Sequence, residues 1–100
     1  MKINIKSEGT KKWIELDGRL DTTAAPELGK VIEQELKNGV KELEIDMGKC
    51  GYVASSGLRV ILQAQKTMNR VGGSMVVRNV NELVMEVFEM TGFSSILTIE

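Results

Sequence analysis

The sequence predicts a single small α/β domain that spans all 100 residues. Two observations support this fold class. Short segments with the apolar pattern of strands are interleaved with longer segments of helical periodicity, and their order is β-β-α-β-α-β-α-β. Such an order is typical of a mixed, mostly parallel sheet whose parallel strands are joined by right-handed crossovers. We therefore expect a sheet of four to five strands with the helices mainly on one face.

Two strands open the chain. Residues 2–6 and 12–17 each alternate polar and apolar side chains, and Gly9 lies in the turn between them. We expect an antiparallel hairpin. Lysine on an edge strand discourages pairing with other chains, so the lysines of this hairpin predict a monomer that is recruited only by its partners. They are Lys2, Lys6, Lys11 and Lys12.

The first helix is expected after Thr22 and Thr23, either of which can cap it. Pro26 suits a first helical turn, where its missing N–H has no helical partner. Apolar residues then recur at helical spacing as far as Leu36, and Gly39 is expected just beyond the end of the helix.

The middle of the chain is expected to contain a strand at residues 41–46, a loop with Gly48 and Gly51, and a helix from about Ser56 to Arg70. One side of this helix is apolar. The opposite side carries a polar row at helical spacing, which we interpret as a solvated face: Arg59, Gln63, Lys66 and Arg70.

Three further elements complete the chain. A short apolar strand is predicted at residues 74–78. A third helix follows, with Asn79 or Asn81 as its cap and Gly92 as its stop, and residues 95–99 are predicted to form a terminal strand.

The composition argues against several functions. The net charge is −1 and no block of like charges occurs, so neither nucleic acid nor a membrane is an expected partner. No signal peptide or spanning segment is evident, and the single cysteine, Cys50, suits a reducing compartment, so we expect a cytoplasmic protein. The chain has no histidine, which removes the usual general base and most metal-ligand sets. We expect no enzymatic activity, no cofactor and no metal.

The candidate site is the pair of serines that leads into the second helix. One serine is enough to cap a helix, and a surplus hydroxyl at the positive end of a helix dipole suits an anion such as phosphate. The simpler interpretation is that Ser55 and Ser56 only cap the helix. Parallel strands place their sites at the carboxyl edge of the sheet, where Asp21 and Asp46 are also expected. Asp21 could equally be no more than a capping carboxylate.

The residues around these serines carry a resemblance. The run from Asp46 to Leu62, with Ser56-Gly57-Leu58 at its centre, is similar to the signature of STAS domains, above all the small stand-alone anti-sigma factor antagonists of bacteria. Two flanking segments match the same family, Gly18–Asp21 and Gly92–Leu97, so the resemblance covers nearly the whole chain. One departure is Ala54, where many members carry an acidic residue.

The resemblance implies a phospho-switch. A partner kinase that doubles as an anti-sigma factor would phosphorylate the serine before Gly-Leu, which is Ser56 here, and a separate phosphatase would reset it. The unmodified protein would bind the kinase and free a sigma factor. The expected partner surface is Asp21, Thr22, Asp46, Ser55, Gly57, Leu58 and Arg59. Two alternatives remain open: a non-switching STAS scaffold, and a module that senses a small ligand such as a nucleotide.

Overall fold

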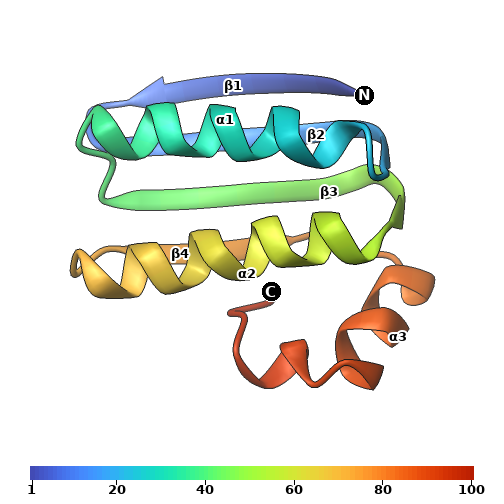
Figure 1. The fold of residues 1–100 in the computed structure, drawn as a ribbon. Helices are drawn as coiled ribbons and strands as arrows, with labels where there is room; N and C mark the ends of the chain where they lie inside the picture. The colour runs from blue at the N-terminus through green and yellow to red at the C-terminus, as the bar shows by residue number, and fades with distance from the viewer.

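The computed structural model describes residues 1–100 and shows a sheet of four strands and three α-helices (Figure 1). The elements are β1 (Lys2–Glu8), β2 (Lys11–Leu20), α1 (Ala24–Lys37), β3 (Glu42–Val53), α2 (Ser55–Arg70), β4 (Ser74–Arg78) and α3 (Glu82–Met90). A short 3₁₀ turn, η1 (Phe93–Ser95), follows.

The strand order in the sheet is β1-β2-β3-β4, which is also the order in the sequence. β1 pairs with β2 antiparallel, whereas β2, β3 and β4 are parallel. Ile14 marks the register, since it lies opposite Ile5 on one side and Ile45 on the other. The predicted fold class, a mixed and mostly parallel sheet that begins with a hairpin, is confirmed.

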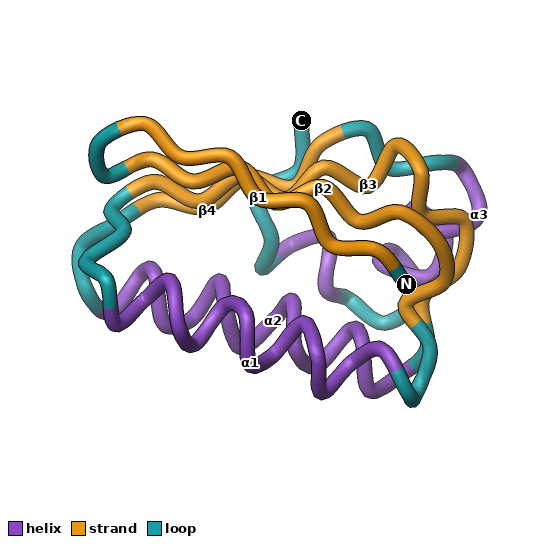
Figure 2. Tube along the Cα trace, turned by 90° about the horizontal axis from the view of Figure 1, so that it is seen from above, coloured by secondary structure: helices purple, strands orange, loops and turns teal.

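The molecule has two layers, because α1 and α2 cover the same face of the sheet (Figure 2). The core lies between the sheet and these two helices. It contains 21 buried residues, among them Ile14 and Ile45 from the sheet and Ile61 from α2. α3 sits at the carboxyl end of β3 and inserts Val84 and Phe88 into the same core. The other face of the sheet is open and carries polar side chains such as Glu15 and Glu44.

β3 is longer than the sequence indicated, because the predicted loop around Gly48 and Gly51 is part of the strand. A side chain at position 48 would crowd its neighbours: a Cβ atom there would lie 3.2 Å from Asp46 Oδ1 and 3.4 Å from Asn79 Cβ. Glycine therefore allows this close packing within a strand rather than marking a turn.

The terminal strand predicted at residues 95–99 does not form. Backbone N–H groups here bond within a turn instead, and Leu97 N–H donates to Phe93 O at 2.9 Å. Only Ile99 pairs with the sheet, in an isolated parallel bridge to Val77. No helix of the structure is long and apolar enough to cross a membrane.

Candidate functional site at the start of α2

Two strand-to-helix connections meet at the carboxyl edge of the sheet. The backbone N–H of Ala54, which precedes α2, donates to Leu20 O at the end of β2 over 2.9 Å. The Leu20 side chain also lies against Gly57, where an added Cβ atom would come within 2.6 Å of Leu20 Cγ. These contacts hold the start of α1 and the start of α2 side by side.

Asp21 caps α1. Its Oδ1 accepts hydrogen bonds from the backbone N–H groups of Thr23 at 3.1 Å and Ala24 at 2.9 Å. The predicted caps Thr22 and Thr23 do not act as such: Thr23 occupies the N-cap position but makes no side-chain bond. An Asp side chain two or three residues upstream already satisfies the free N–H groups. Asp21 therefore does cap the helix, and Thr22 is exposed beside it.

α2 begins without a cap. Its N-cap residue is Ala54, no side chain accepts from its first turn, and that turn contains no acidic residue. Ser55 and Ser56 are the first two residues of the helix, so the expectation that a serine caps it is wrong. The other helices differ: α1 has Asp21 and Glu27, and α3 has a capping residue and an acid, Asn81 and Glu82. The start of α2 thus keeps unpaired N–H donors and the positive end of the helix dipole.

The hydroxyl groups of the two serines differ in environment. Ser55 is exposed, whereas the Oγ atom of Ser56 is buried and has no hydrogen-bond partner. A buried hydroxyl without a hydrogen-bond partner costs free energy. The position of Ser56 Oγ is therefore explained either by a function of this hydroxyl or by a second rotamer that gives it a partner. To react with an external group, Ser56 must turn its hydroxyl outward about the Cα–Cβ bond.

The neighbours of Ser56 in α2 divide between core and surface. Gly57 and Leu58 are buried, with Leu58 only 5% exposed, so a contact between the Leu58 side chain and a partner does not fit this structure. Arg59 is exposed and makes no ion pair within the chain. It begins the predicted solvated row, whose other members, Gln63, Lys66 and Arg70, are also exposed.

Asp46 lies apart from the serines. Because β3 continues to Val53, Asp46 is in mid-strand and on the open face of the sheet, not at the carboxyl edge as expected. Its Oδ1 accepts from Asn79 Nδ2 at 3.0 Å and from Gly48 N–H at 2.9 Å. These two bonds, and the charge of Lys49, lower the pKa of Asp46. Its evident role is to tie β3 to the residues that follow β4.

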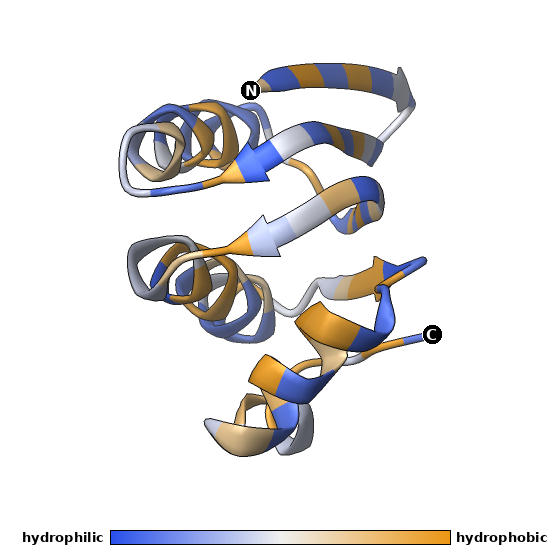
Figure 3. Cartoon of the chain, turned by 90° about the vertical axis from the view of Figure 1, so that its right-hand side faces the viewer, coloured by the Kyte–Doolittle hydropathy of each residue, from blue (hydrophilic) through white to orange (hydrophobic).

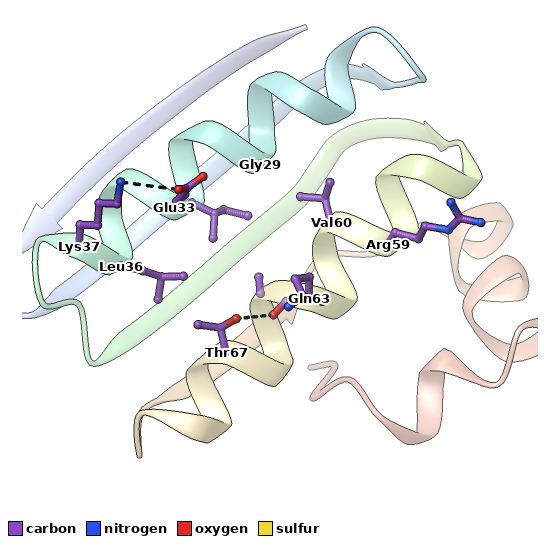
Figure 4. Close-up of a pocket in the computed structure, with 10 residues that line it drawn as sticks. Gly29, Glu33, Leu36, Lys37, Arg59, Val60, Gln63 and Thr67 are labelled. Carbon is purple, nitrogen blue, oxygen red and sulfur yellow. Dashed lines mark hydrogen bonds and ion pairs between the residues drawn. The ribbon is translucent and has the colours of Figure 1, made fainter.

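Two hollows are present that neither serine lines. A groove of about 630 Å³ runs between α1 and α2, with Leu36 and Val60 among its apolar walls and Arg59 at one end (Figure 4). A second hollow, of about 840 Å³, lies on the open face around Trp13 and Asp46. The structure contains no group of three or more potential metal-binding side chains.

Cys50 is buried beneath the end of β3, with 1% of its surface exposed. Its Sγ donates a weak hydrogen bond to Tyr52 O at 3.4 Å, and desolvation raises the pKa of the thiol. Cys50 therefore acts as a small apolar residue of the core.

Sequence reasoning missed the part played by Leu20. Its contacts with Ala54 and Gly57 join segments that are far apart in the chain, and no local pattern reveals such a contact. The sequence held one indication of this contact. If β2 and β3 are neighbouring parallel strands, the helices that follow them start at the same edge of the sheet.

The fold and the site together define a class of protein. A mixed sheet covered on one face by two helices presents, at its carboxyl edge, the uncapped start of a helix that carries a serine. The chain matches the family model described as "Mlab, STAS domain" over residues 3–98. The protein therefore belongs to the STAS-domain family.

One relative and two solved structures show what this chain is similar to. BtrV of Bordetella bronchiseptica, provisionally named an anti-sigma factor antagonist, is 32% identical over 84 residues, which cover 84% of this chain and 72% of BtrV. The Thermotoga maritima protein TM1081 has a similar crystal structure, with a TM-score of 0.91 at 21% identity over 97% of this chain and 84% of that one. SpoIIAA of Bacillus in its phosphorylated form gives a TM-score of 0.79 at 18% identity, over 99% and 91% of the two chains.

Proposed function

We propose that this protein is an anti-sigma factor antagonist that works as a phospho-switch at Ser56. In the unmodified form it binds a protein kinase that is also an anti-sigma factor, and so releases a sigma factor. Phosphorylation of Ser56 blocks that binding, and a phosphatase reverses it. The name of BtrV supports the role, and the phosphorylated SpoIIAA structure supports the idea that this fold accommodates a phosphoryl group.

The observation that carries the proposal is the uncapped start of α2 beside Ser56. The kinase would transfer the γ-phosphoryl group of ATP to Ser56 Oγ, which loses its proton, and ADP would leave. Once the side chain has turned outward, the phosphate lies at a helix N-terminus with unpaired N–H donors and no acidic neighbour in the first turn. It adds a charge of about −1.5 to −2, which is favourable at this end of a helix. The fold should therefore remain intact.

The switch then acts on the contact with the partner rather than on the fold. Thr22, Ser55 and Arg59 are exposed and belong to the two segments that meet at the carboxyl edge of the sheet, and they are the residues that we assign to this contact. An added phosphate at the centre of this surface brings bulk and charge, and it offers Arg59 an internal partner in place of an external one. We assign no contact role to Asp46, which lies on the open face of the sheet.

The decisive experiment is intact-mass analysis after incubation with the cognate kinase and ATP. We expect wild type and Ser55→Ala to gain one phosphoryl group and Ser56→Ala to gain none. Modification of Ser56→Ala but not of Ser55→Ala would move the site to the exposed Ser55 hydroxyl. No modification of any of the three would favour a non-switching scaffold.

Binding provides the second test. Ser56→Asp should weaken binding to the kinase in calorimetry by at least tenfold, with little change in melting temperature. Ser74→Asp is the matched control, since it places the same charge on an exposed side chain at the start of β4, outside the proposed contact. Unchanged binding by Ser56→Asp would place the contact elsewhere on the molecule.

A further inference from the structure

One face of α3 exposes apolar side chains that the proposed switch does not use. Leu83 is 68% exposed and Met90 is 85% exposed, and Val87, which is half-buried, lies between them. The three residues are spaced i, i+4 and i+7, so they form one stripe along the helix. The residues that bury α3, Val84 and Phe88, lie on its other side.

An acidic row runs beside this stripe. Glu82, Glu86 and Glu89 have the same i, i+4, i+7 spacing, displaced by one residue, and all three are exposed. None of them takes part in an ion pair, and α3 contains no lysine or arginine. Figure 3 shows the alternation of apolar and hydrophilic segments along this helix. We call these six residues the α3 face.

The α3 face lies at the carboxyl end of the sheet. Asn81, which precedes α3, donates from Nδ2 to Cys50 O at 3.5 Å, so the helix starts near the carboxyl end of β3. It lies at the same end of the molecule as the start of α2 (Figure 1).

We propose that the α3 face is a docking surface for a basic amphipathic helix of a protein partner. An apolar stripe with a parallel row of uncompensated carboxylates is complementary to a helix that carries leucine-like residues beside a row of lysine or arginine. Such a helix buries Leu83, Val87 and Met90 and places its cations opposite the glutamates. This docking does not depend on phosphorylation at Ser56.

Charge argues against two other occupants. In a symmetric dimer through this face, each copy would bring its three glutamates against those of the other. The basic row of α2 in a second copy does not match either, because no exposed side chain within α2 is apolar. An anionic membrane would be repelled by the same carboxylates.

The test uses a synthetic 18-residue peptide with a leucine face and a flanking lysine row, titrated into the isotope-labelled full chain and followed by NMR. We expect shifts that cluster on α3, and an affinity that falls as salt is raised, because exposed charges are screened. The same peptide with glutamate in place of lysine should not bind. Shifts that cluster in the groove between α1 and α2, or equal binding of both peptides, would overturn the proposal.

Variants separate the two rows. Leu83→Ser with Met90→Ser should weaken peptide binding at least tenfold. Glu82→Gln, Glu86→Gln and Glu89→Gln together should weaken it and remove most of its salt dependence. A charge-matched control changes three exposed glutamates outside α3, Glu8, Glu27 and Glu42, to glutamine and should bind like wild type. If this control loses as much affinity as the α3 variant, attraction is general and the α3 face is not a site.

Two further measurements would show whether a membrane or a second copy of the chain binds the α3 face instead. Binding of wild type to phosphatidylglycerol vesicles that is lost in the leucine and methionine variant would indicate a membrane. A wild-type dimer in sedimentation that the variant lacks would indicate a second copy. Ser56→Asp should bind the peptide like wild type, so failure of the phospho-switch and failure of this proposal give different results.

Discussion

Gly57 and Leu20 lie so close that any larger residue at position 57 requires Leu20 to shift. A Cβ atom there would be 2.6 Å from Leu20 Cγ and 3.0 Å from Leu20 O. Leu20 is fully buried and its carbonyl group accepts the N–H of Ala54, so neither can move freely. This contact aligns the start of α2 with the start of α1.

Gly57→Ala should therefore destabilise the protein by about 2 kcal/mol, as expected for overpacking of a core. Gly29→Ala is the matched control in α1, since its Cβ atom would meet only Val60 at an ordinary 3.8 Å. That change should stabilise by up to about 1 kcal/mol through helix propensity. Urea unfolding of both variants measures the difference. Equal stability of the two would show that Leu20 repacks without cost.

Ala54→Asp should stabilise the protein by about 1 kcal/mol, because it supplies the side-chain acceptor that α2 lacks. Ala54→Asn separates the hydrogen bond from the charge and should retain most of the gain. Thermal unfolding provides the measurement. A loss of stability in both variants would mean that the first turn of α2 is already satisfied by other groups.

Ser56→Ala should stabilise the unmodified protein by about 1 kcal/mol, since it removes a buried hydroxyl that has no partner. Ser55→Ala removes an exposed hydroxyl at the adjacent position and should gain less. Chemical denaturation of the two variants decides the point. If Ser56→Ala were the less stable of the two, the Ser56 hydroxyl would make a contact that the structure does not contain.

The stability of the protein should depend on pH through Asp46. Hydrogen bonds from Asn79 and Gly48 lower its pKa in the folded state, so the carboxylate stabilises the fold above its unfolded pKa of about 4. That contribution is lost as the pH falls through the lower, folded-state value. The free energy of unfolding, measured from pH 6 downward, should therefore fall less with decreasing pH for Asp46→Asn than for wild type.

Asn79→Gly provides the companion variant, because it removes the main hydrogen bond to Asp46. Glycine also tolerates the left-handed backbone at this position, where φ is 60°. It should also reduce the pH dependence. An unchanged profile in both variants would mean that the carboxylate is equally stable in the folded and unfolded states.

Cys50 should react with a thiol reagent only when the protein unfolds, because it is 1% exposed and its thiol pKa is raised. Absorbance with Ellman's reagent, with and without urea, measures this. Light scattering should show a monomer with or without reductant. Rapid labelling of the native protein would indicate that the end of β3 opens, and a dimer in reductant would contradict the expected monomer.

The order of strands and helices could be predicted because periodicity is a local property of the sequence. The exceptions are places where distant contacts decide. Gly48 lies within β3, where Asp46 and Asn79 pack close to it. Residues 95–99 form a turn and one bridge to Val77, and the Thr98 N–H donates to the Gln65 side chain instead of to a strand. None of these distant contacts is visible in a window of neighbouring residues.

The candidate site shows the same division. The place of Ser56 at a helix start could be predicted from the strand, glycine and helix pattern around it. The groups that cap each helix could not be predicted, because Asp21, Thr22 and Thr23 lie within one turn and each carries a side-chain oxygen that can accept a hydrogen bond. The burial of Ser56 Oγ depends on a rotamer, which the sequence does not encode locally.

The uncapped first turn of α2 also has a consequence for the rate of amide exchange with solvent. Backbone N–H groups without an acceptor exchange their protons faster than paired ones. The N–H groups of residues 55–57 should therefore exchange faster than those at the starts of α1 and α3. A phosphate on Ser56 would accept from these groups and slow them. Modification would then slow amide exchange in this segment, and release of the phosphate would restore the faster exchange.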